Sequence, residues 1–349
     1  MKFKLEDLVR ENIKKLKPYS SARHEFKGEA SVFLDANENS YGSPLQENFN
    51  RYPDPLQWQL KLSIAGIKDI TAENIFIGNG SDEVIDLAYR VFCEPRKDNV
   101  IICPPTYGMY KVSANINDVE IKKVNLTNEF QLDVEGILEA TDENTKLLFI
   151  CSPNNPTGNN MRRSDIEMLL NNFNGLIIID EAYINFSKQK TFIKEFTEYP
   201  NLIVMQTLSK AWGLASLRLG LAFASLDIID LFNKVKPPYN INNASQQLAR
   251  EALQNSQQVN NWIKETIEQR NFLDQNLSTL SYVDKIYESD ANFLLLKVKD
   301  ANKLYNYLSE NKIVIRNRSK EVNCENCLRI TVGTPQENLE LIKTLKNYE

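Results

Sequence analysis

Histidine is the scarcest residue of the chain: His24 is the only one among 349 residues. A Ser/His/Asp hydrolase would have to use this residue, yet it lies in the polar segment SARHEFKGE with no nucleophile motif beside it. General acid–base chemistry is therefore expected from a lysine or a carboxylate.

Cysteine is also sparse, and its number is odd. Five cysteines in a mid-sized chain without a secretory signal argue against a disulfide framework. Cys324 and Cys327 form one CxxC pair, but the chain has no second pair and only one histidine to complete a structural zinc site. We therefore predict two thiols in a loop and no bound metal.

Long apolar runs and basic tracts are both missing. No uninterrupted apolar run approaches the about eighteen residues of a membrane span, and the N-terminal MKFKLEDLVRENIKKLKPY mixes both charge signs, unlike a signal peptide. Acids outnumber bases by 46 to 41, for a formal net charge of −5, so the electrostatic footprint of a nucleic-acid binder is absent. We predict a cytoplasmic protein with no membrane or nucleic-acid partner.

Between residues 72 and 225 the chain alternates short β-rich runs with helical stretches. The runs are IFIG (75–78), VIIC (100–103), LLFIC (147–151), LIIID (176–180), LIVM (202–205) and LGLAFA (219–224). This alternation predicts an α/β fold with a mostly parallel central sheet, whose ligands bind beyond the carboxyl ends of the strands.

The C-terminal third follows a different pattern. Residues 226–290 are expected to be mainly helical, and strands and helices then group together in the way typical of a smaller α+β domain. The strands expected there are NFLLLKV (292–298), IVIR (313–316) and LRITV (328–332), with a final helix from Pro335. Apolar residues at helical spacing over 5–16 suit an arm packed on a partner subunit. The predicted organisation is an arm (1–30), a large domain (31–235) and a small C-terminal domain (236–349).

Lys210 and Asp180 are the two residues that best indicate the chemistry. Lys210 lies just past the apolar run LIVM, where its amine can be held out of water, and a desolvated lysine is a Schiff-base nucleophile. Asp180 ends a β-branched run typical of a fully buried strand. An imine-forming lysine and a carboxylate that pairs with a pyridinium nitrogen are the groups that pyridoxal phosphate needs most.

A phosphate site is indicated by GNGSDE (78–83), which joins a strand to a helix. Glycine lets the backbone approach a phosphate there, and the N–H groups of the helix point at it. Glu83 stands where a dinucleotide fingerprint needs its third glycine, which argues against a nicotinamide or flavin site. Ser209 and Arg218 are further candidate anion ligands, since a guanidinium binds phosphate well.

Other strand ends supply residues that suit a planar ring. Tyr107 in PPTYGMY can stack on a heterocycle, and Asn155 in CSPNNPTG can donate to a phenolate oxygen. Tyr183 in DEAY can reach the same ligand face. Each motif alone is more typical of an ordinary turn, but chance agreement among five strand ends is much rarer than any one match.

The motif order resembles that of the fold-type I pyridoxal phosphate-dependent aminotransferases. The motifs are GNGSDE, PTYGMY, SPNNPTG, DEAY, SKAWGLASLR and LRITVGT, and LDANEN (34–39) with NRYPDP (50–55) points within that family to the histidinol-phosphate aminotransferases. The resemblance covers nearly the whole chain, from KPYSSAR at 17–23 onward. Ser216 departs from it, because the family usually has glycine there; serine is tolerated if its φ is not positive.

The resemblance implies a role for each cofactor-site residue. Lys210 links to pyridoxal phosphate and moves a proton between substrate and cofactor carbons, while Asp180 keeps the pyridine nitrogen protonated. The other implied contacts are Asn155 and Tyr183 at the ring phenolate, Tyr107 stacked on the ring, and Gly80, Ser81, Asp82, Ser209, Arg218 and the partner subunit's Tyr52 at the phosphate.

The resemblance also implies the substrates. Arg329 and Arg316 would bind substrate anions, with Asn155 and Tyr19 beside them, and Arg318 competes with Arg316 for its role. The implied protein is a homodimer with shared active sites. Its reaction would convert histidinol phosphate and 2-oxoglutarate to imidazole acetol phosphate and glutamate, in histidine biosynthesis.

Three alternatives stay open at this point. An aromatic amino acid aminotransferase would also present a ring and an anion to the pocket. A pyridoxal phosphate-dependent decarboxylase of a phosphorylated amino acid would release carbon dioxide without a keto product. A non-catalytic regulator that binds the cofactor usually carries an added DNA-binding domain, for which 349 residues leave no room.

Overall fold

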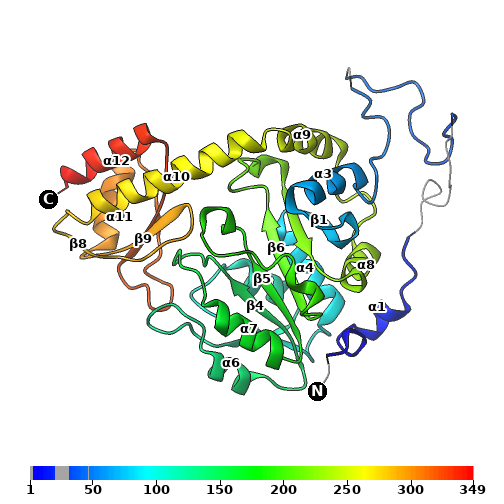
Figure 1. The fold of residues 1–349 in the computed structure, drawn as a ribbon, viewed down its shortest axis with the longest axis horizontal. Helices are drawn as coiled ribbons and strands as arrows, with labels where there is room; N and C mark the ends of the chain where they lie inside the picture. Colours follow the sequence, from blue (N-terminus) through cyan, green and yellow to red (C-terminus); the bar gives the residue numbers. More distant parts are fainter. Residues whose placement is uncertain (1–2, 20–30, 46, 349) are drawn as a thin grey trace.

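Two β-sheets organise the chain in the computed structural model, which describes residues 3–19, 31–45 and 47–348. Figure 1 shows the larger sheet at the centre and the smaller one beside the C-terminal helices. The larger sheet has the order β1-β7-β6-β5-β4-β2-β3 and the smaller one the order β10-β11-β9-β8. The large-sheet strands are β1 (Ile75–Asn79), β2 (Asn99–Ile102), β3 (Glu120–Lys123), β4 (Thr145–Cys151), β5 (Leu176–Asp180), β6 (Leu202–Thr207) and β7 (Leu219–Phe223). The small-sheet strands are β8 (Val283–Ile286), β9 (Phe293–Val298), β10 (Arg316–Asn317) and β11 (Cys327–Thr331).

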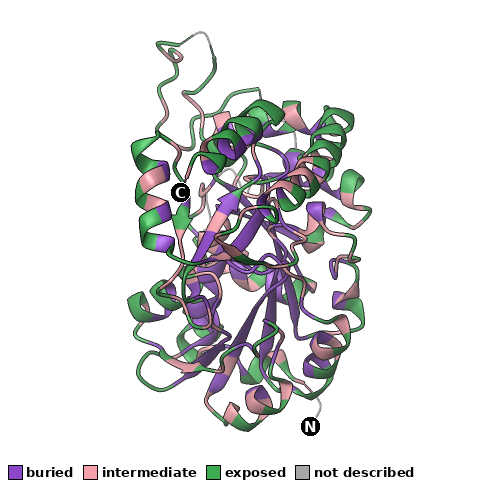
Figure 2. Cartoon of the chain, turned by 90° about the vertical axis from the view of Figure 1, so that its left-hand side faces the viewer, coloured by how far each residue is buried: buried purple, intermediate pink, exposed green. Residues whose placement is uncertain are grey.

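The large sheet is mostly parallel, as its apolar runs predict. Strands β3, β2, β4, β5 and β6 pair in parallel, and only β7 runs antiparallel to both of its neighbours, β6 and β1. Continuous Leu, Ile and Val runs suit strands that are covered on both faces. In β5 every residue is buried, and Figure 2 shows the central strands in purple while the outer helices carry green outward faces.

Helices cover both faces of the large sheet. Ile177 and Ile179 of β5 share one core with α3 (Trp58–Lys68), α6 (Val134–Ala140) and α7 (Arg163–Asn172). Leu176 and Ile178, on the other face, share a second core with α4 (Ser81–Phe92), α5 (Met109–Ile116) and α8 (Leu226–Val235). The alternation of strand side chains therefore places the sheet between two helical layers.

A third core joins the small sheet to the C-terminal helices. Its helices are α10 (Ser256–Leu277), α11 (Ala301–Glu310) and α12 (Pro335–Lys346), while α9 (Asn243–Leu253) packs near α3. The predicted start of α12 is confirmed: Pro335 is its first residue, and Thr334 and Glu337 form a reciprocal capping box. Within the described residues no helix is long and apolar enough to cross a membrane.

Several sequence predictions need correction. The expected strand 313–316 is wrong except at Arg316, because β10 contains only Arg316–Asn317. The strands β3 and β8 were not predicted, and β8 lies inside the stretch 226–290 that was expected to lack strands. The boundaries of the large and small domains stay predictions, and His24 lies outside the described residues.

The N-terminal segment also differs from its prediction. The helical pattern over 5–16 forms a short 3₁₀ helix, Leu5–Asp7, and α1 (Glu11–Lys15). Leu8, Val9 and Ile13 are buried in the core that contains α4 and α8 of the same chain. This first part of the predicted arm therefore packs on its own chain, and its contact with a partner stays a prediction.

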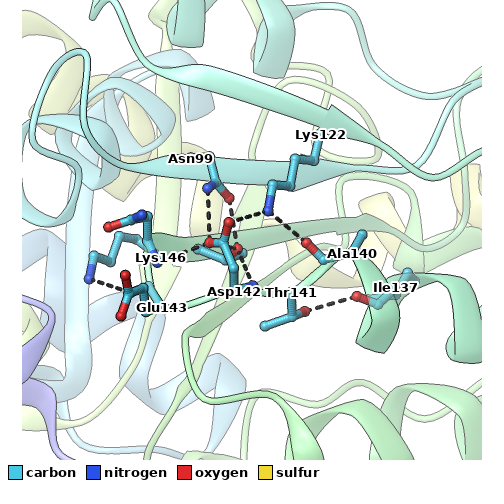
Figure 3. A network of polar contacts seen from close by, with 10 residues as sticks. Asn99, Lys122, Ile137, Ala140, Thr141, Asp142, Glu143 and Lys146 are labelled. Atoms are coloured by element: carbon cyan, nitrogen blue, oxygen red, sulfur yellow. Dashed lines mark hydrogen bonds and ion pairs between the residues drawn. The ribbon is translucent and has the colours of Figure 1, made fainter.

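A polar cluster ties the amino ends of the parallel strands together (Figure 3). The Asp142 carboxylate accepts hydrogen bonds from Lys122 Nζ at 2.6 Å, Asn99 Nδ2 at 3.0 Å and Thr145 Oγ1 at 2.9 Å. Asn99 begins β2, Thr145 begins β4, and Lys122 lies in β3. The three strands are thus joined by side chains at the edge opposite to their carboxyl ends, where ligands bind in such sheets.

Gly220 of β7 allows a close approach that shapes the other edge. It lies opposite Gly78 of β1 in the strand pairing. A Cβ at Gly220 would lie under 3.0 Å from three backbone atoms, Ser81 N, Gly80 C and Gly80 O. The turn before α4 can therefore rest on β7 only because this residue has no side chain.

We expect Gly220→Ala to lower the free energy of unfolding by about 1–3 kcal/mol, the usual cost of overpacking, because backbone cannot move aside as a flexible side chain can. Urea denaturation of the two proteins measures the difference. Gly66→Ala is the matched control: a Cβ there meets nothing within 4 Å in α3, so it should stabilise the protein slightly. Equal effects of both substitutions would contradict the close approach.

Candidate active site

The sequence-predicted residues meet at one cavity of about 310 Å³ at the carboxyl ends of the parallel strands. Eleven of the predicted site residues line it: Ser81, Asp82, Tyr107, Asn155, Asp180, Tyr183, Ser209, Lys210, Arg218, Arg316 and Arg329. Arg318, the named competitor of Arg316, lines it too. The sequence analysis missed Cys151, Ala182 and Thr207, although each lies at or next to the end of a recognised strand, and that position was the available signal.

Asp180 is the buried acid of the site. It is the last residue of β5 and only 4% exposed. Its Oδ2 accepts a hydrogen bond from the Tyr110 hydroxyl at 2.7 Å, and its Oδ1 accepts one from the Ala182 N–H at 3.0 Å. Burial raises the pKa of Asp180, while the two hydrogen bonds and the Lys210 ammonium oppose that rise. The carboxyl group is therefore placed where a cationic partner would stabilise its charged form.

Lys210 lies in the turn after β6, on the same cavity. Its ammonium lies 5.6 Å from the centre of the Tyr183 ring. The residue as a whole is exposed in the chain alone, and the exclusion of water from its amine stays a prediction. Protein atoms still crowd the ammonium, and this desolvation, followed by the charge of Arg329, lowers the pKa of Lys210. A larger fraction of neutral amine is the result, as a nucleophile requires.

The start of α4 forms an anion cradle. Gly80 has a φ of 75°, its N–H donates to the Arg218 carbonyl at 2.8 Å, and a Cβ on it would lie 2.5 Å from Arg218 Nη2. Arg218 itself has a left-handed φ of 55°, and its guanidinium lies 3.4 Å from Asp82. Ser81 adds a hydroxyl at the first turn of the helix. Amide groups and a guanidinium thus converge where a phosphate is best held.

The serine that departs from the family pattern is accommodated. Ser216 lies in the 3₁₀ helix Ala215–Leu217. In this loop the positive φ values fall on Gly213 and Arg218, and not on Ser216. The condition stated for tolerating a serine there is therefore met.

Tyrosines and Asn155 surround the space between the cradle and Asp180. The Tyr107 hydroxyl donates to Asp82 Oδ1 at 3.2 Å. The Asn155 amide donates to the Tyr183 hydroxyl at 3.4 Å, and the Tyr183 ring meets Phe293 edge to face at 5.2 Å. Burial raises the pKa of the Tyr183 phenol, so this hydroxyl remains protonated and able to donate.

Three arginines form the opposite wall. Arg316 of β10 and Arg329 of β11 face each other in the strand pairing, and Arg318 follows in the next turn. Arg329 donates to Asn155 Oδ1, while its Nε and that of Arg318 are buried without a hydrogen-bond partner among the described residues. Burial and the charge of Arg318 lower the pKa of Arg329. An anion bound here would relieve both desolvation and repulsion.

Three predicted residues, Gly80, Tyr52 and Tyr19, are not among those that line the cavity of their own chain. Tyr52 is exposed and stacks on Tyr239 with ring centres 4.5 Å apart. Tyr19 is 74% exposed and lines a different cavity, with Lys61. The roles of Tyr52 and Tyr19 stay predictions, and that of Tyr52 requires a second copy of the chain.

The cysteines show no metal site or disulfide. All five are free and buried, and Cys327 N–H donates to the Cys324 carbonyl at 2.9 Å in a turn. Among the described residues no group of histidine, cysteine and acidic side chains could hold a metal ion.

The cavity suits the group that the sequence indicated. A pyridine ring with a protonated nitrogen would give Asp180 the cation that its burial lacks. The cradle of Gly80 and Arg218, kept open by the absence of a Cβ, would hold a phosphate. Lys210 supplies an amine between these two ends. The residues present therefore fit pyridoxal phosphate.

Comparisons with known sequences identify a family and full-length relatives. A family model described as "Aminotransferase class I and II" matches residues 33–345. The chain is 53% identical over 348 residues to a histidinol-phosphate aminotransferase of Cytophaga hutchinsonii, with all of both chains covered. It is 54% identical over 346 residues to one of Bacteroides thetaiotaomicron, with 99% of each covered.

Solved structures show the same fold at lower identity. A histidinol-phosphate aminotransferase from Clostridium acetobutylicum superposes with a TM-score of 0.79 at 23% identity, covering 86% of this chain and 90% of that one. The enzyme from Sinorhizobium meliloti, in complex with pyridoxal-5′-phosphate, gives 0.77 at 21% identity, covering 89% and 90%.

We expect the Lys210 amine of the ligand-free protein to titrate below its ordinary pKa of 10.5, because burial and Arg329 both disfavour the ammonium. Arg329→Gln should raise the pKa of Lys210 by removing a positive charge, and Asp180→Asn should lower it further by removing a negative one. The rate at which acetic anhydride modifies the Lys210 peptide, followed by mass spectrometry against pH, measures all three proteins. Shifts of the same sign in both variants would contradict the assigned electrostatics.

Proposed function

The chain belongs to the class I and II aminotransferases and, within them, to the histidinol-phosphate aminotransferases, and we propose that it transfers the amino group of L-histidinol phosphate to 2-oxoglutarate. The products are imidazole acetol phosphate and L-glutamate, in a step of histidine biosynthesis. The observation that carries the proposal is the meeting of Lys210, Asp180 and three arginines at one cavity. The cofactor is pyridoxal 5′-phosphate, which supplies an electron sink when bound.

Lys210 and Asp180 perform the central steps in this proposal. Lys210 would hold the cofactor through its ε-amine, and its Nζ, when free, would take a proton from the substrate Cα. Its lowered pKa supports that use of the amine as a base. Asp180 keeps a proton on the ring nitrogen, since its buried carboxylate is stabilised by a cation on that side.

The remaining cofactor residues position the ring. Ser81 and Asp82 would offer backbone groups at the start of α4, Gly80 leaves the space beside Arg218 free of a Cβ, and Arg218 and Ser209 would add side-chain donors for the phosphate. Tyr107 stacks on the ring, and Asn155 with Tyr183 donates to its phenolate oxygen, which their existing contact at 3.4 Å supports.

The arginine wall binds the substrate anions. Arg329 is the main ligand and Arg316 or Arg318 the second one, since all three line the cavity. Five basic side chains against two carboxylates line this cavity in a chain whose net charge is −5. A dianionic phosphate gains more from such a cluster than an uncharged aromatic ring does, which favours histidinol phosphate over phenylalanine or tyrosine. The same guanidinium groups would donate hydrogen bonds to the carboxylates of glutamate.

A homodimer with shared active sites completes the proposal. Tyr52 and Tyr19 are exposed away from the cavity of their own chain, so each would serve the cavity of the partner. Large apolar side chains are also exposed in the stretch before Tyr52, with Leu34 at 82% and Leu45 at 63% exposure. A partner surface would cover them. The cytoplasmic location and the absence of a nucleic-acid partner stay predictions from the sequence.

The substrate is tested by a half-reaction. Protein loaded with pyridoxal phosphate is mixed separately with histidinol phosphate, glutamate, phenylalanine and tyrosine, and loss of the absorbance of the lysine-bound cofactor is followed. We expect conversion by histidinol phosphate at far lower concentration than by either aromatic amino acid. Equal or better conversion by phenylalanine or tyrosine would indicate an aromatic aminotransferase, and carbon dioxide release without a keto product would indicate a decarboxylase.

The shared site is tested by complementation. Lys210→Ala should abolish turnover and Tyr52→Ala should remove most of it. In a hybrid dimer of the two variants one site keeps both residues, so we expect about half of the wild-type turnover per dimer. Differently tagged copies, co-expressed and purified over both tags, provide the hybrid. A hybrid no more active than Tyr52→Ala alone would show that both residues act within one chain.

A further inference from the structure

Tyr110 is a buried tyrosine that the cavity does not expose. It is the second residue of α5, it is fully buried, and it is absent from the cavity lining. Its hydroxyl nevertheless donates to Asp180 Oδ2 at 2.7 Å, and the two residues lie 70 positions apart in the sequence. It therefore contacts the central acid of the site from behind.

Ring stacking and hydrogen bonds hold the Tyr110 side chain in place. Its ring stacks on Phe149 of β4 at 4.8 Å and 16°. Its backbone carbonyl accepts a hydrogen bond from the Tyr89 hydroxyl at 2.8 Å, a contact that does not involve the Tyr110 phenol. Because the Ala182 N–H holds the other oxygen of Asp180, both carboxylate oxygens have a fixed donor.

We propose that Tyr110 is a positioning residue for the cofactor ring nitrogen. The hydrogen bond from its hydroxyl holds the Asp180 carboxyl group ionised and oriented, so that the shared proton lies on the ring nitrogen and not on Asp180. The inference rests on the proposed function of the site. It concerns a residue that touches neither cofactor nor substrate and acts only through Asp180.

The charge balance at Asp180 supports this role. Burial alone would favour the neutral acid, and the hydrogen bond from Tyr110 is the largest effect that opposes it, ahead of the Ala182 N–H and Lys210, while Asp82 acts in the opposite sense. A donor to the charged form makes a carboxylate less basic. Burial and Asp180 also raise the pKa of Tyr110, so the phenol keeps its proton and stays a donor.

The test compares Tyr110→Phe with Tyr89→Phe, which removes the neighbouring buried hydroxyl without touching Asp180. Two readouts are used: the nitrogen-15 NMR shift of ring-labelled pyridoxal phosphate in the holoenzyme, and the Kd of the ligand-free protein for pyridoxal phosphate. We expect Tyr110→Phe to move the shift toward that of an unprotonated pyridine and to raise Kd about tenfold, the usual effect of losing a hydrogen bond to a charged group. Tyr89→Phe should change neither.

Wild-type readouts in both variants would overturn the proposal and leave Tyr110 a packing residue. If Tyr110→Phe does not fold, 4-aminophenylalanine placed at position 110 keeps the ring and weakens the donor. The shift should then move toward the unprotonated value, and an unchanged shift overturns the proposal. Failure of the proposed function is distinguishable, because a wild-type protein that does not bind pyridoxal phosphate gives no ring signal at all.

Discussion

The placement of one buried carboxylate, Asp180, is the constraint on which the other site residues depend. A carboxylate at 4% exposure is costly unless fixed donors and a cation surround it. The fold meets this need with a strand end between parallel neighbours, a backbone N–H from Ala182 and a phenol from Tyr110. The cation is left to a ligand, which makes the site selective for a ring that can carry a proton.

The cavity is lined mainly by positively charged side chains, although the net charge of the chain is negative. A chain with a net charge of −5 gathers Arg218, Lys210 and three further arginines around two carboxylates. Arg316 and Arg329 lie in the small sheet and Arg318 follows β10, whereas the lysine and the cradle lie in segments next to strands of the large sheet. Because β10 and β11 pair Arg316 directly with Arg329, the wall cannot spread to reduce repulsion. Bound anions reduce it instead, which is how an acidic protein attracts acidic substrates.

The sequence predicts the central strands well, because continuous apolar runs such as LIIID are typical of strands covered on both faces. The prediction of strands fails at the edges of the sheets. The strand β3 reads EIKK, and the polar side chains of an edge strand carry no apolar period. The run IVIR also misleads, since Val314 is 85% exposed and pairing begins only at Arg316.

The sequence likewise predicts the site residues at strand ends and misses those that only the packing brings into place. Residues at strand ends were found because parallel strands deliver their carboxyl ends to one edge. Tyr110 was not, because its partner lies 70 residues away and only the packing of α5 on β4 brings them together. The exposure of Lys210 also follows from the shape of the open cavity, which no local pattern encodes.

The antiparallel strand β7 joins the cofactor residues Lys210 and Arg218 in one loop, apart from the arginines proposed for the substrate anion. The chain leaves β6 at Thr207 and returns in β7 opposite it at Gly220, and Leu208 N–H bonds the Leu219 carbonyl at 3.0 Å. Lys210 and Arg218 thus sit on one closed loop, at a separation that the ladder fixes. The arginines for the second anion stand on another sheet. A shift between the sheets would therefore move the arginines relative to the cofactor residues, and the contact between Arg329 and Asn155 links the two sets.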